Sequence, residues 1–202
     1  MRADAVAAAV CASTASASCF WLLARRGATR RGTMLRAAPA WPVLVAAAAT
    51  GGASVAGSPY AAALVAAAPA AAICASTDWE VGLIFDDVTA TALCAILVVE
   101  AVRGEMLAAL AGSALVVALL GSLRAVTRGT GLGLGDVKFG AIAGASLGVL
   151  DGVASIGLAF VLAGCYGAVL LAMRRAGRGS IVRFGPFLAA GLLCVGIHPC
   201  FR

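Results

Sequence analysis

Long apolar runs separated by short charged stretches are the feature that most limits what this chain can fold into. A helix that crosses a bilayer needs about 20 mostly apolar residues, a length that some of these runs reach and others only approach. We therefore expect an all-α polytopic membrane helix bundle with about eight apolar segments, one of which, 137–150, is short enough to be a partial or tilted span. The segments are expected at residues 4–24, 41–57, 59–76, 88–102, 106–123, 137–150, 152–173 and 184–198.

Composition excludes an ordinary soluble domain. Apolar residues make up 62% of the chain and the mean hydropathy is +1.03, whereas soluble domains contain about half apolar residues. The net charge of +6 does not indicate nucleic acid, because basic residues in a membrane protein mainly set its orientation. The lipid bilayer is the expected surrounding, and no nucleic-acid partner is expected.

The seven cysteines are scattered and include no C-x-x-C pair. Because such pairs mark zinc and redox sites, most of these cysteines are interpreted as small buried hydrophobic residues. His198 lies close to Cys200, but two ligands do not make a metal site, and His198 is more simply an interfacial residue. No metal and no organic cofactor is expected.

The arginines predict the orientation of the bundle. Basic residues follow the first apolar run instead of preceding it, which favours a retained helix with its N-terminus outside over a cleaved signal peptide. Alternating spans then leave only Arg2, Arg103 and Arg202 outside, so the positive-inside rule is obeyed. The inside loops are 25–40, 77–87, 124–136 and 174–183.

A glycine-rich stretch at residues 131–148 contains a single acid, Asp136, where the stretch turns into an apolar helix. Glycine recurs at every fourth position afterwards, which lets a second membrane helix approach closely. An ionisable residue at the mouth of such a helix is a candidate functional residue. The alternative is a solvated acid that caps the helix N-terminus. The recurring glycines are Gly140, Gly144 and Gly148.

The sequence Gly133-Leu-Gly135-Asp-Val-Lys138, continued by Ala141 and Gly144, resembles the GxGD motif of the type IV prepilin peptidases. This family consists of intramembrane aspartic proteases that remove the leader peptides of type IV pilins and pseudopilins. The resemblance implies that Asp136 is a catalytic acid. Lys138 matches the family's lysine, and its alternative role is an anchor that snorkels to the membrane edge.

Proteolysis by carboxylates needs a second acid on the same membrane side. One carboxylate activates a water molecule, and the other, protonated, donates to the scissile carbonyl. The resemblance implies that Asp78 is the family's first catalytic aspartate and that Asp86 is the acid of a later Pro-Asp pair, although Phe85 stands where the family usually has proline. From the residues alone, Asp86 and Asp87 are better explained as caps of the following helix, and Glu80 as a loop residue.

A third patch, Phe184-Gly185-Pro186-Phe-Leu, is similar to the family's FGPFL stretch that opens the last helix. Pro186 also suits a first helical turn and Gly185 a tight entry. The larger family members carry a cytoplasmic domain with paired cysteines, linked to N-methylation, where residues 25–40 stand here. The resemblance therefore implies a compact peptidase without that domain.

Together these features predict a single membrane-embedded peptidase domain over residues 1–202 in the inner (plasma) membrane, with Asp78 and Asp136 facing the cytoplasm. The implied substrate is a prepilin or pseudopilin precursor, cleaved between its basic leader and its apolar helix. One alternative is a small transporter or assembly factor in which the two acids bind a cation or relay protons. Another is a degenerate family member without activity. The sequence makes no prediction of oligomeric state.

Overall fold

The computed structural model describes residues 3–30, 32, 40–55, 57–175 and 182–198, and within these residues it is all-helical. Four of its helices, α1, α3, α5 and α6, are long and apolar enough to cross a membrane. The seven helices of the described part are α1 (Ala3–Arg30), α2 (Ala40–Val55), α3 (Ala61–Val81), α4 (Asp86–Arg103), α5 (Met106–Val126), α6 (Leu134–Ala172) and α7 (Gly185–Ile197).

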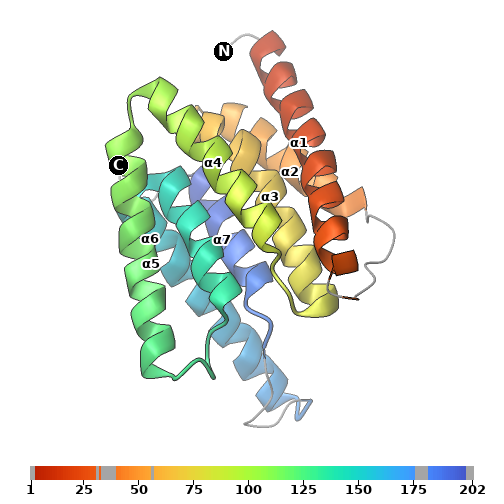
Figure 1. Cartoon of the computed structure of the whole chain (residues 1–202), viewed down its shortest axis with the longest axis vertical. Coiled ribbons are helices and arrows are strands. Elements are labelled where there is room, and N and C mark those ends of the chain that lie inside the picture. The colour runs from red at the N-terminus through yellow and green to blue at the C-terminus, as the bar shows by residue number, and fades with distance from the viewer. Residues whose placement is uncertain (1–2, 31, 33–39, 56, 176–181, 199–202) are drawn as a thin grey trace.

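The seven helices differ from the expected eight segments at α6. The runs 137–150 and 152–173 both belong to α6, which is interrupted at Gly148 by a φ of 72° and a ψ of −162°. A Cβ added at Gly152 would lie 3.1 Å from the Cα of Gly144, whereas residues eight apart rise about 12 Å along a straight helix. The two arms of α6 therefore fold back on each other (Figure 1). The boundary predicted at Asp151 is wrong, because the reversal needs a positive φ, which glycine adopts readily.

Helix α3 forms the centre of the bundle. Nearly half of its residues are alanine, and nearly all residues from Ala63 to Asp78 are buried. Because alanine side chains are small, neighbouring helices approach α3 from several sides, and α1, α2, α4 and α7 all pack against it. The helix ends at Gly82, whose N–H donates to the carbonyl oxygen of Asp78 at 2.8 Å. Asp78 therefore lies in the last turn of the most enclosed helix.

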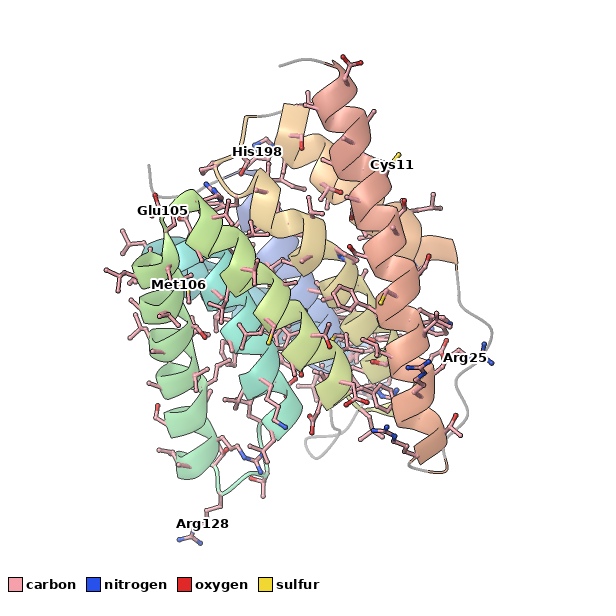
Figure 2. The ribbon with its side chains drawn as sticks, turned by 45° about the horizontal axis from the view of Figure 1, so that its top comes forward. Cys11, Arg25, Glu105, Met106, Arg128 and His198 are labelled. Carbon is pink, nitrogen blue, oxygen red and sulfur yellow. The ribbon has the colours of Figure 1, made fainter. Side chains whose placement is uncertain are left out.

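Contacts between residues that are distant in the sequence show which helix termini lie together at each end of the bundle. At the Asp78 end, Arg30 at the end of α1 lies 3.7 Å from Asp87 at the start of α4. At the opposite end, the Ser58 hydroxyl donates to the carbonyl of Gly196 at 2.6 Å. Figure 2 shows the side chains of Arg25 and Arg128 toward the Asp78 end, and those of Glu105 and His198 toward the opposite end.

Two of the predicted loops are partly helical. Helix α1 continues to Arg30 and α3 to Val81, so the loops predicted at 25–40 and 77–87 begin later than expected. Large apolar side chains are exposed on the outer surface, with Leu107 on α5 and Val161 on α6 among them. Because such side chains suit contact with lipid, they and the apolar helices indicate a multi-pass membrane protein.

Candidate active site

Asp78 is buried, and its carboxylate is held by the start of α7. The N–H of Gly185, the first residue of α7, donates to Asp78 Oδ2 at 2.9 Å. A helix N-terminus carries partial positive charge, which favours a carboxylate there. A Cβ added at Gly185 would lie only 2.8 Å from the same oxygen. Glycine is therefore the residue that lets the main chain of α7 reach Asp78.

Arg183 holds the backbone of the same turn. Its guanidinium donates to the carbonyl oxygen of Asp78 at 2.7 Å and also to that of Trp79. These carbonyls belong to the last turn of α3, where backbone donors are few, so Arg183 adds to the Gly82 N–H that already reaches the carbonyl of Asp78. From the sequence, Arg183 is predicted only to lie in the basic loop at 174–183. Nothing in the local sequence signals its contact, because its partner lies 105 residues away.

Asp136 is the third residue of α6 and is half-buried. Its Oδ2 accepts a hydrogen bond from the N–H of Gly133 at 2.9 Å, so the acid does cap the helix N-terminus. Gly135 lies against the segment that follows α3, since a Cβ there would meet Ile84 at 2.9 Å. The GxGD glycines thus hold the Asp136 carboxylate and let the start of α6 approach the end of α3.

Asp78 and Asp136 lie at the same end of the bundle, where the charge of Asp78 acts on Asp136. Arg124 attracts Asp136 and donates to the carbonyl of Leu132 at 2.5 Å, so it anchors the glycine-rich loop as well. The arrangement places two carboxylates, each hydrogen-bonded to a glycine N–H, at one end of the bundle, on helices that are distant in the sequence. Such a pair has the groups needed for acid–base chemistry on a water molecule.

The capping role predicted for Asp86 and Asp87 is wrong. The N-cap of α4 is Phe85, which makes no side-chain cap hydrogen bond, and the two acids are the first residues of the helix. There they are favoured by the helix dipole. Asp86 also pairs with Lys138, whose Nζ lies 2.8 Å from its carboxylate. Lys138 therefore joins the start of α6 to the start of α4.

Comparison with known proteins places the chain in a family. The sequence model of the type IV leader peptidase family matches residues 65–168, which is more than half of the chain. The chain belongs to the type IV leader peptidase family. Membership indicates a peptidase, and it implies the processing of prepilin-type substrates in a membrane. The match includes Asp78, Asp86, Asp136 and Lys138. No curated protein and no solved structure matches the chain.

Phe85 is where the sequence departs from the pattern of type IV leader peptidases. The side chain is buried and lies against Gly27 of α1, where an added Cβ would meet the ring at 2.7 Å. The phenylalanine therefore fills the space between α1 and α4, and α4 starts directly after it. Phe85 thus packs between α1 and α4, and Asp86 is the first residue of α4.

The remaining motif residues of this leader peptidase family member serve helix packing. A Cβ added at Gly144 would lie 2.3 Å from the carbonyl oxygen of Gly112, and one added at Gly112 would lie 2.3 Å from that of Gly144. The recurring glycines predict that another helix packs closely against α6, but they do not identify that helix as α5. Pro186 lies in the first turn of α7, where its missing N–H costs nothing.

Proposed function

We propose that the chain is an aspartic endopeptidase in which Asp78 and Asp136 form the catalytic pair, within one membrane-embedded domain over residues 1–202. The observation that supports the proposal is that two acids from α3 and α6 lie at one end of the bundle, where the charge of Asp78 acts on Asp136. Each carboxylate is also held by one backbone N–H, from Gly185 and Gly133 respectively.

The mechanism follows from the chemistry of two neighbouring carboxylates. Two such groups do not both ionise readily, so they share one proton. The ionised partner accepts a proton from a water molecule, which attacks the scissile carbonyl, while the protonated partner donates to the carbonyl oxygen. The gem-diol then breaks its C–N bond, and the proton taken from water passes to the leaving amine. The glycine N–H groups occupy one oxygen of each carboxylate, and the proposal requires the second oxygen of each to face the scissile bond.

The proposed substrate is the precursor of a type IV pilin-like protein or pseudopilin, cleaved at the junction of its leader and its apolar helix. The side of the membrane is inferred from charge. Arg25, Arg30 and Arg128 belong to the Asp78 end, and basic residues favour the cytoplasmic side. This supports an active site at the cytoplasmic face of the inner membrane, with the N-terminus outside.

The positions of the acids favour a peptidase over a transporter or an assembly factor. Asp78 lies in the last turn of α3 and Asp136 in the first turn of α6. Acids that carry a cation or proton across a membrane are expected nearer the middle of their helices. A bond at the junction of a cytoplasmic leader and a membrane helix lies instead at the membrane edge, where these two acids are.

Co-expression with a candidate prepilin tests the proposal. Asp78→Asn and Asp136→Asn keep side-chain size but remove the titratable proton, so each should lower leader removal by about 100-fold or more while membrane insertion stays normal. Glu80→Gln is the matched control, because Glu80 is an exposed acid in the same turn as Asp78. Unchanged leader removal in both asparagine variants would rule out the proposed pair.

A further inference from the structure

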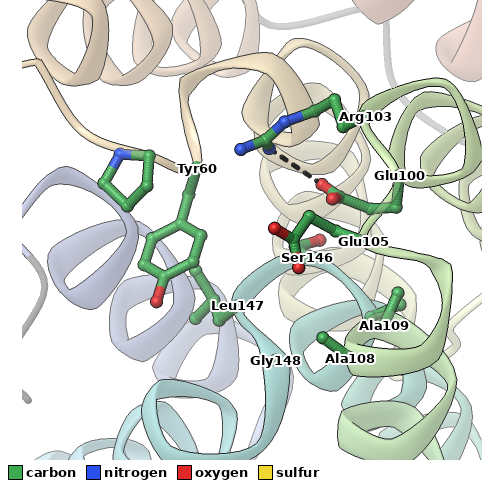
Figure 3. A pocket seen from close by; sticks show the side chains of 11 residues that line it. Tyr60, Glu100, Arg103, Glu105, Ala108, Ala109, Ser146, Leu147 and Gly148 are labelled. Atoms are coloured by element: carbon green, nitrogen blue, oxygen red, sulfur yellow. Dashed lines mark hydrogen bonds and ion pairs between the residues drawn. The ribbon is translucent and has the colours of Figure 1, made fainter.

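A second polar site lies at the end of the bundle opposite Asp78. A cavity of about 280 Å³ opens there between the end of α4, the start of α5 and the reversal of α6. Figure 3 shows Arg103 and Glu105 on one side of this cavity and Tyr60 on the other. The hydroxyl of Tyr60 donates to the buried Asp151 at 2.6 Å, which fixes the ring as a wall of the cavity.

The cavity presents one cationic and one anionic side chain. Arg103 lies 3.1 Å from the buried Glu100, and this contact uses one of its five N–H donors. Glu105 is exposed, and among the described residues no ion pair involves it. The charges of Glu100 and Arg103 cancel. The cavity therefore has a net negative charge from Glu105, next to the Arg103 guanidinium, which still has N–H donors available.

The surroundings of the cavity match a membrane interface. Helix α5, which is long and apolar enough to cross a membrane, begins at Met106, directly after Glu105. Arg103 and Glu105 therefore lie at the end of an apolar helix, where a membrane interface is expected. Val102 and Leu107, on either side of the turn that carries Arg103 and Glu105, are 85% and 82% exposed. Apolar side chains therefore border the charged cavity on the outer surface.

We propose that this cavity binds the head group of an amine-bearing phospholipid of the phosphatidylethanolamine type. The guanidinium of Arg103 binds the phosphate, because arginine presents several donors in a planar fork. The carboxylate of Glu105 binds the ammonium, and the ring of Tyr60 faces the same cation. The acyl chains run along Val102 and Leu107.

The chemistry of the head group explains the choice among lipids. A primary ammonium has three N–H donors for Glu105, whereas the trimethylated ammonium of phosphatidylcholine has none. Phosphatidylglycerol has no ammonium at all, so its phosphate would leave the charge of Glu105 uncompensated. The site should therefore prefer phosphatidylethanolamine to both of the other lipids.

Native mass spectrometry of the full chain in detergent tests the proposal. The probes are phosphatidylethanolamine, phosphatidylcholine and phosphatidylglycerol with identical acyl chains. Phosphatidylethanolamine should be retained at the lowest lipid concentration. Glu105→Gln and Arg103→Gln should each weaken its binding about tenfold, a change that corresponds to losing one charge-assisted contact. Glu80→Gln, at the other end of the bundle, is the matched control and should bind like the wild type.

Two results would overturn the proposal. One is equal retention of the three lipids, and the other is wild-type retention of phosphatidylethanolamine by the folded Glu105→Gln variant. Should Arg103→Gln fail to fold because Glu100 loses its partner, Glu105→Gln still decides the matter. Competition by water-soluble glycerophosphoethanolamine would support head-group recognition. Its failure to compete would place the binding on the acyl chains alone and contradict the assignment.

Discussion

The contact between α5 and α6 gives a sharp test of the fold. Gly112 of α5 and Gly144 of α6 approach backbone to backbone, and we predict that alanine at either position destabilises the protein. The added Cβ would lie 2.3 Å from a carbonyl oxygen of the other helix, whereas real Cβ contacts essentially never fall below 3.0 Å. The two helices must therefore separate locally by at least 0.7 Å.

The size of the expected loss in stability depends on whether the atoms next to the added Cβ can move aside. Overpacking of a well-packed core costs about 1–3 kcal/mol, and here the neighbouring atoms are backbone, which cannot turn aside as a side chain can. We therefore expect the free energy of unfolding of each variant to be about 2–3 kcal/mol lower than that of a matched glycine-to-alanine control, in the upper part of that range. The control shares the gain in helix propensity of about 1 kcal/mol, so this gain cancels in the comparison.

The controls are Gly121→Ala in α5 and Gly157→Ala in α6, because a Cβ at either position meets nothing within 4 Å. Unfolding of the purified protein in detergent, followed by circular dichroism, gives the four free energies. If Gly112→Ala and Gly144→Ala were as stable as their controls, α5 and α6 would not pack at this distance. The first arm of α6 also carries Asp136, so the two destabilised variants should lose leader-cleavage activity.

Three further predictions concern the Asp78 end. Gly185→Ala places a Cβ 2.8 Å from Asp78 Oδ2, so it should slow leader cleavage at least tenfold, measured on purified precursor, with unchanged helix content. Lys138→Asp combined with Asp86→Lys should restore the melting temperature that either single change lowers, with a coupling of about 0.2–1 kcal/mol for an exposed pair that disappears at high salt. Arg183→Met removes the donors to the carbonyls at the end of α3; cleavage should slow through kcat with KM unchanged, and Arg183→Lys should recover part of the loss.

The all-helical character of the fold could be predicted because it depends on the length and apolarity of each run. The reversal within α6 could not be located in the same way. Asp151 separates the predicted segments 137–150 and 152–173, yet this acid is buried within α6 and accepts a hydrogen bond from the Tyr60 hydroxyl. The chain turns instead at Gly148, one of three glycines at identical spacing, and only the conformation distinguishes it from Gly140 and Gly144.

The candidate acids could be predicted because a motif marks Asp136 and alternating spans place Asp78 on the same side. Their supporting contacts could not be predicted, because those contacts join residues that are distant in the sequence. Gly185 has an ordinary role in a tight helix entry, and nothing local reveals that its N–H reaches Asp78. In the same way, the small-residue stripe of α6 predicts a close neighbour without identifying Gly112 of α5.

The two candidate acids share one structural device that explains how they tolerate each other. Asp136 accepts from Gly133 at the N-terminus of its own helix, and Asp78 accepts from Gly185 at the N-terminus of α7. Helix N-termini carry partial positive charge, so the starts of α6 and α7 offset the repulsion between the carboxylates. A Cβ on either glycine would crowd the carboxylate that it holds, at 3.1 Å for Gly133 and 2.8 Å for Gly185. Glycine at both positions therefore lets the N-termini of α6 and α7 come close to the carboxylates of Asp136 and Asp78.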